Sequence, residues 1–261
     1  MNSDFARRLA ITAAEILCII GTMVGLGVLG GPEVQQASGG ALAADATYIA
    51  PAVPAFSIWT PIYLGLLVYT IWQWRAVGES PRHRATGWLA AATMVLNALW
   101  LLVVRAGWLW VSVAIIAALV LTLGVLMSRL TSMPAESTLD RVITDGTFGL
   151  YLGWVSVATC ANIAATLVDS GFEPQKWVAE ILTVIVLAVA AGLGMLYADR
   201  LGPRLGVALA MGWGLGWIAV GRLTDRPEST VVGIAAAIAA LVVLAATAAA
   251  RRRPLPHTRT A

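Results

Sequence analysis

The strongest constraint on the fold is a series of eight apolar segments. Each is about 20 residues long, the length at which a helix crosses a hydrocarbon core of about 30 Å. Continuous apolar runs predict helices, whereas membrane strands would alternate apolar and polar residues. Charged residues make up only 12% of the 261 residues, about half the fraction usual in soluble domains. The sequence therefore predicts an all-α polytopic membrane protein, with spans near 9–29, 57–74, 86–104, 109–127, 147–167, 178–196, 205–221 and 230–250.

Basic residues are distributed unevenly between the two ends of these spans. An even number of spans puts both chain termini on the same side of the membrane. The opposite side receives only four of the 17 Lys and Arg residues, namely Arg105, Lys176, Arg222 and Arg226. Because cytoplasmic loops carry the excess of basic residues, we expect both termini to be cytoplasmic. We expect the membrane to be a bacterial plasma membrane.

Aromatic and hydroxyl side chains recur along one side of the segment 56–74. In a helix, Trp59, Tyr63 and Trp74 fall on roughly one face. A helix that serves only for packing would more often carry Leu, Val and small residues there. We interpret this face as the wall of a ligand pocket. The alternative is a packing face, with Trp72 and Trp74 as interfacial anchors.

The third and fifth spans carry amides beside aromatic side chains. An amide in lipid needs a partner, so each should face protein or a cavity, either as part of a pocket or as a structural contact. The aromatic and polar face of the fifth span complements that of the second. The candidate binding residues in these spans are Asn97, Trp100, Tyr151, Trp154, Thr159 and Asn162.

The outer loop between the first two spans is the longest in the chain, covering residues 30–56. Long loops among short ones are commonly lids or binding loops. Pro51 and Pro54 would stiffen the approach to the second span, and Tyr48 lies near them. We predict that Tyr48, Pro51 and Pro54 belong to a lid over the pocket.

Glu15 is the carboxylate most deeply placed in an apolar segment. A charged side chain at mid-bilayer costs on the order of 3 kcal/mol by insertion scales. Glu15 therefore reaches the interface, stays protonated, or hydrogen-bonds a neighbouring helix. The sequence leaves open whether its role is functional or structural.

The inner loop 128–146 is the longest polar connector on the cytoplasmic side. It contains Asp140 and Asp145, which have Arg129 and Arg141 nearby in the sequence. We interpret it as a solvated connector in which these residues pair.

Several classes of chemistry lack their sequence signatures. There is no Gly-rich phosphate loop, HExxH or GxSxG motif, so we predict no catalytic residue. Cys18 and Cys160 both lie inside apolar runs, which argues against a disulfide framework and a zinc site. His83 and His257 lie outside the spans and cannot ligate a haem within the membrane. The basic residues lie between spans and at the ends, so we expect no nucleic-acid partner.

Three short stretches carry a family resemblance. PAFSIWTPIY at 54–63, LNALW at 96–100 and WVSVATCAN at 154–162 occur in order on the second, third and fifth spans. Together they resemble the TspO/MBR family, the tryptophan-rich sensory proteins related to the mitochondrial translocator protein. The resemblance covers roughly residues 9–168.

This resemblance implies a five-helix bundle, often dimeric, with a pocket beneath the first outer loop. In that family the pocket binds porphyrins and, in some members, sterols or drug-like aromatics. The resemblance places Trp59 and Trp154 on the pocket wall, with Asn97, Trp100, Thr159 and Asn162 nearby. The sequence departs from the family in lacking a tryptophan in the first loop. It also adds three helices after the bundle, which predicts a TspO-like bundle over 1–170, three further helices over 171–250 and a basic cytoplasmic tail over 251–261.

The leading hypothesis is a membrane protein that binds, senses or carries a planar hydrophobic ligand such as a porphyrin or haem-type molecule. Indoles and phenols would stack on the ligand, and amides would orient it or brace the pocket. No obligatory cofactor is expected. The alternatives are a secondary transporter of small hydrophobic solutes, an enzyme that degrades a bound porphyrin, and a structural partner subunit.

Overall fold

The computed structural model describes residues 3–30, 33–34 and 36–252. Its eight long helices have the length and composition needed to cross a membrane, which confirms the predicted all-α fold. They are α1 (Ser3–Gly25), α2 (Trp59–Trp72), α3 (Pro81–Arg105), α4 (Leu109–Ser132), α6 (Thr147–Asp169), α7 (Lys176–Arg200), α8 (Leu205–Thr224) and α9 (Thr230–Arg252). Shorter helical turns join them: η1 (Ser38–Gly40), η2 (Val53–Ile58), η3 (Ala76–Glu79), α5 (Thr138–Asp140) and the π-helical η4 (Arg141–Gly146).

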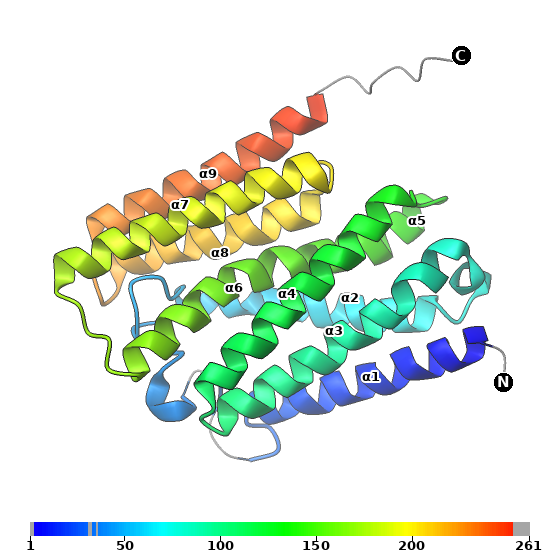
Figure 1. Ribbon diagram of the computed structural model, residues 1–261, viewed down its shortest axis with the longest axis horizontal. Helices are drawn as coiled ribbons and strands as arrows, with labels where there is room; N and C mark the ends of the chain where they lie inside the picture. Colours follow the sequence, from blue (N-terminus) through cyan, green and yellow to red (C-terminus); the bar gives the residue numbers. More distant parts are fainter. Residues whose placement is uncertain (1–2, 31–32, 35, 253–261) are drawn as a thin grey trace.

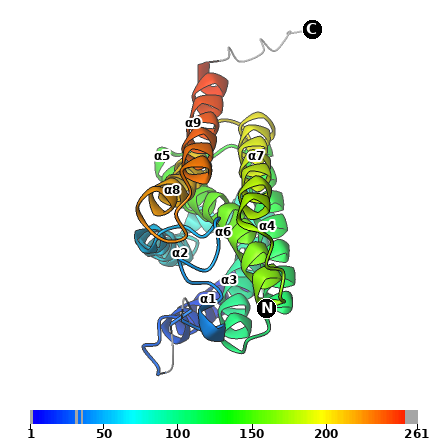
Figure 2. The same ribbon diagram turned by 90° about the vertical axis from the view of Figure 1, so that its left-hand side faces the viewer.

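The helices form a bundle several helices deep (Figures 1 and 2). On one side α1 packs against α3, and α3 against α4. In the middle α6 contacts α4, α2 and α8, while α9 joins α8 to α7 on the other side. The N-terminal end of α1 and the C-terminal end of α9 lie at the same end of the bundle (Figure 1). The positive-inside rule assigns this end to the cytoplasm.

The last three helices join the rest of the bundle through a close contact between α6 and α8. A Cβ atom placed on Gly149 would lie 3.4 Å from the Cα atom of Gly206. Small residues at such positions let two helix backbones approach closely. The boundary predicted at residue 170 stays a prediction, and residues 253–261 of the predicted tail lie outside the described residues.

Gly153 provides a test of this contact. A Cβ atom at Gly153 would overlap the carbonyl oxygen of Val207 and lie 2.9 Å from the Ala210 Cβ atom. Overpacking of this kind costs about 1–3 kcal/mol, so we expect Gly153→Ala to lower the melting temperature in detergent. Gly216 has open space around it, which makes Gly216→Ala the matched control. Equal melting temperatures for the two variants would contradict the close approach.

A buried ionic network closes the cytoplasmic end of the bundle. The Arg82 guanidinium donates a hydrogen bond to Asp145 at 2.6 Å and forms an ion pair with Asp140 at 3.1 Å. His83 Nε2 lies 2.9 Å from the second oxygen of Asp140, and Arg204 also pairs with Asp145. Four of the five residues in this network are buried, and the fifth, Arg204, is partly exposed.

The predicted pairing within the loop 128–146 was therefore wrong. Asp140 and Asp145 do not pair with Arg129 or Arg141 but with residues of α3 and with Arg204, which precedes α8. The reason is that residues 138–146 are helical and extend α6 towards the cytoplasm. Their carboxylates consequently face neighbouring helices instead of solvent.

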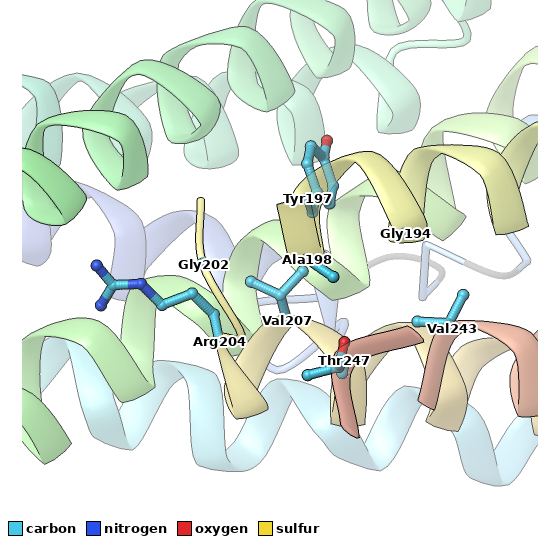
Figure 3. Close-up of a pocket in the computed structure, with 9 residues that line it drawn as sticks. Gly194, Tyr197, Ala198, Gly202, Arg204, Val207, Val243 and Thr247 are labelled. Atoms are coloured by element: carbon cyan, nitrogen blue, oxygen red, sulfur yellow. The ribbon is translucent and has the colours of Figure 1, made fainter. Parts of the chain in front are cut away.

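A crevice between the cytoplasmic ends of α7, α8 and α9 is a packing seam. Figure 3 shows Val207, Val243 and Thr247 near the end of α7, while the side chain of Arg204 extends away from them. The seam leaves no room for a water molecule. We therefore interpret it as a packing contact between the three helices.

Candidate functional site

The outer loop is held against α8 by main-chain contacts. The Ala52 amide donates to the Trp217 carbonyl at 3.2 Å. The indole Nε1 of Trp213 donates to the Ala55 carbonyl at 2.9 Å. The loop lies at one end of the bundle, beside α6 and α8 (Figure 1). These bonds fix the segment that leads into η2 and α2.

Arg222 of α8 fixes the middle of the same loop. Its guanidinium donates to the carbonyl of Thr47 at 2.8 Å and to that of Ala44 at 2.9 Å. Only 1% of Arg222 is exposed. From the sequence it was an outer-side basic residue used only to assign topology. Its anchoring role was missed because main-chain carbonyl acceptors leave no mark in the sequence.

Two cavities lie beneath this loop, and Phe56 and Trp100 line both of them. The first has a volume of about 180 Å³ and lies between α1, α2 and α3. The second, of about 40 Å³, lies between the loop and α6. The first is lined by Thr22, Gly25, Leu26, Glu33, Val34, Phe56, Trp59, Thr60, Tyr63, Trp100 and Leu101.

An aromatic cluster separates the cavities from the core of the bundle. The ring of Trp59 stacks on that of Tyr63, with centroids 5.1 Å apart and planes inclined by 12°. Trp59 also meets Tyr151 and Trp154 edge to face, each at 6.1 Å. Phe56 meets Trp154 in the same way at 5.8 Å. The aromatic faces of the second and fifth spans therefore meet in the structure.

Most of the predicted pocket residues reach a cavity. Trp59 and Tyr63 line the first cavity, and Trp100 lines both. Trp154 and Asn162 line the second. Sequence reasoning missed Phe56, which stands three residues before Trp59 and therefore close to the same helix face.

The other predicted pocket residues line neither cavity. Tyr151 is fully buried, and its hydroxyl donates to the Thr93 carbonyl at 3.2 Å. The Thr159 hydroxyl donates to the Val155 carbonyl of its own helix at 2.8 Å. The ring of Tyr151 meets that of Trp59, which lines the first cavity, edge to face. Tyr151 therefore belongs to the surrounding core, whereas Thr159 is half-buried on α6.

The two amides brace the aromatic walls. Asn97 Nδ2 donates to the Tyr63 hydroxyl at 3.0 Å. Asn162 Oδ1 accepts the Trp100 Nε1 hydrogen at 3.0 Å, and its Nδ2 donates to the Ser112 hydroxyl at 2.9 Å. Asn97 lines neither cavity, so it acts through the Tyr63 hydroxyl. These bonds fix the orientation of two rings that a ligand would contact.

The three predicted lid residues lie in three different places. Pro51 lines the second cavity. Pro54 lines a basin on the outer surface of the loop. Tyr48 lines a groove on the other side of α6. The loop thus covers the cavities, but only Pro51 of these three residues faces them.

Several buried polar atoms near the site have no hydrogen-bond partner among the described residues. They are Oε2 of Glu15, Oδ1 of Asn97 and the indole Nε1 of Trp154. Glu15 is 2% exposed and does not line a cavity. Trp154 lines the second cavity. In the part of the chain that the structure describes, no three His, Cys, Asp or Glu side chains gather as metal ligands.

Eight membrane-length helices, with aromatic cavities beneath an anchored outer loop, define a polytopic helical membrane protein with a built-in pocket. The family model for TSPO-like proteins matches residues 9–249, and the chain belongs to this family. The match confirms the resemblance seen in the sequence and extends through α7, α8 and α9. Comparisons with curated proteins and with solved structures gave no match.

Proposed function

We propose that this TSPO-like protein binds a planar hydrophobic ligand of the porphyrin type in the cavities beneath its outer loop. The observation that carries the proposal is the wall of Trp59, Tyr63, Trp100 and Trp154 around them. Such rings hold a flat apolar ligand by stacking, while the free Trp154 N–H supplies a hydrogen bond. The role is binding, sensing or carriage in a bacterial plasma membrane. A homodimer stays a prediction.

The size of the cavities determines how such a ligand would bind. Volumes of about 180 Å³ and 40 Å³ are below the range of about 300–1,000 Å³ typical of pockets for drug-sized ligands. Phe56 lines both cavities and packs by its edge against Trp154. Together the cavities hold about 220 Å³, so a porphyrin requires Phe56 and the covering loop to move aside, and it would then replace Phe56 against the Trp154 ring.

Replacement of Trp59 tests this proposal. An aromatic pair is worth about 0.5–1.5 kcal/mol beyond its buried area, so we expect Trp59→Leu to raise the Kd for protoporphyrin IX by about 2- to 12-fold. The measurement is a titration followed by the Soret absorption band in detergent. Trp177→Leu is the matched control, since Trp177 is 61% exposed and lies far along the chain on α7. Equal affinities in all three proteins would overturn the proposed pocket.

Two assays separate binding from the alternative activities. Counterflow of labelled porphyrin in proteoliposomes would indicate transport. A new absorbing product after illumination of the complex would indicate degradation. We expect no new absorbing product, because the proposed role needs only saturable binding, and counterflow would distinguish carriage from sensing.

A further inference from the structure

A second and larger opening lies on the other side of α6. It is a groove of about 630 Å³ between α6, α7 and the outer loop. α7 packs mainly against α9 and touches α6 along little of its length, so the two helices leave a space between them. The groove is lined largely by apolar side chains, including Ile163, Leu167, Leu182, Ile185 and Val189.

The length of the groove matches one leaflet of a membrane. Its α7 wall runs from Ala179 to Val189, which is about 15 Å at 1.5 Å per residue. That is half of a hydrocarbon core of about 30 Å. Ile163, Ile185 and Val189 are among the exposed apolar residues of the bundle, so the groove is open to the lipid. A groove of this length can hold one aliphatic tail but is too short for a transmembrane helix.

The outer end of the groove is polar and acidic. Asp45 and Glu173 line it, and no Lys or Arg does so among the described residues. Thr47 also lines it, and this residue is only 7% exposed. The Thr47 hydroxyl oxygen has no hydrogen-bond partner among the described residues, while its carbonyl is held by Arg222. The outer part of the apolar groove therefore has one buried, unpartnered hydroxyl and two exposed carboxylates, and Asp45 also lines the neighbouring basin with Arg222 and Arg226.

We propose that this groove is a second binding site, which takes a single-chain amphiphile with a protonated amine head group. The tail lies between α6 and α7, and the head group reaches the outer end. An ammonium group has three donors and no acceptor, and it complements the Thr47 oxygen and the carboxylates of Asp45 and Glu173. A fatty acid would bring a third carboxylate to this acidic end. α6 separates the apolar part of the groove from the cavities of the proposed function, while Thr47 lines both the groove and the second of those cavities.

Photocrosslinking tests the proposal on the full chain in phosphatidylcholine nanodiscs. The probe is dodecylamine carrying a diazirine in its chain. We expect saturable labelling of residues 160–168 and 182–189, competed by dodecylamine and not by dodecanoate at the same concentration. Labelling spread over the lipid-facing helices without saturation would overturn the site. Equal competition by dodecanoate would overturn the amine head group.

Three variants test which residues contact the bound amphiphile. Thr47→Val removes the hydroxyl and should raise the half-saturating concentration about fivefold, as expected for one net hydrogen bond. Ala164→Phe fills the groove and should abolish saturable labelling. Ile181→Phe is the matched control, because Ile181 is exposed on α7 but does not line the groove. Unchanged labelling in both Thr47→Val and Ala164→Phe would overturn the proposal. If either variant fails to fold, the competition experiment on the wild type still tests the site.

Discussion

Arg82→Met should lower the free energy of unfolding by about 3–5 kcal/mol, because removing one partner of a buried ion pair leaves the other charge uncompensated. Arg82 bonds two buried carboxylates, those of Asp140 and Asp145. It also donates to the carbonyls of Leu130 and Met133 at the end of α4. Its loss would therefore remove the Arg82 contacts of α3 with α5, with η4 and with the end of α4.

The measurement is thermal unfolding of the purified protein in detergent, followed by circular dichroism. Arg129→Met is the matched control, since Arg129 is exposed and its guanidinium donates to the Ala85 carbonyl. Exposed interactions of this kind contribute at most about 1 kcal/mol. If Arg82→Met melts at the temperature of Arg129→Met, the ionic network does not stabilise the fold.

Arg222→Met should release the outer loop from α8. The variant leaves the carbonyls of Ala44 and Thr47 without their donor. Hydrogen bonds to a charged group contribute about 1.5–3 kcal/mol each, so we expect a loss on the order of 3 kcal/mol. Because the lost hydrogen bonds lie in the loop, the loop should lose more stability than the helices do.

Hydrogen exchange of the loop gives the direct readout. Amides in residues 41–52 should exchange faster in Arg222→Met, whereas those in the middle of α4 should not change. Arg226→Met is the control, because the Arg226 side chain is exposed on the same surface. Unchanged exchange in residues 41–52 would show that Arg222 does not hold the loop.

The number of helices and the meeting of two aromatic faces could both be predicted from the sequence. Span length depends on continuous apolar runs, which are visible residue by residue. Trp59 and Trp154 meet edge to face, as the complementary faces of the second and fifth spans indicate. The spacing of residues along a helix fixes the face on which a side chain lies.

The contacts between distant segments could not be predicted. Asp145 pairs with Arg82 and Arg204, which are 63 and 59 residues away, and nothing local in the sequence selects them over Arg141. Phe56 lines both cavities, and nothing local in the sequence sets the orientation of its ring. Periodicity put Tyr151 on the same helix face as Trp154 but could not show that its ring contacts Trp59 and lines neither cavity.

The most direct test of ligand binding is quenching of intrinsic tryptophan fluorescence by protoporphyrin IX in detergent. It compares the wild type with Trp59→Phe/Trp154→Phe, which keeps aromatic rings but removes two indoles from the cavity walls. We expect saturable quenching in the wild type and weaker quenching in the double variant. Quenching that rises linearly and equally in both proteins would show only partition into the micelle, and it would contradict a ligand site beneath the outer loop.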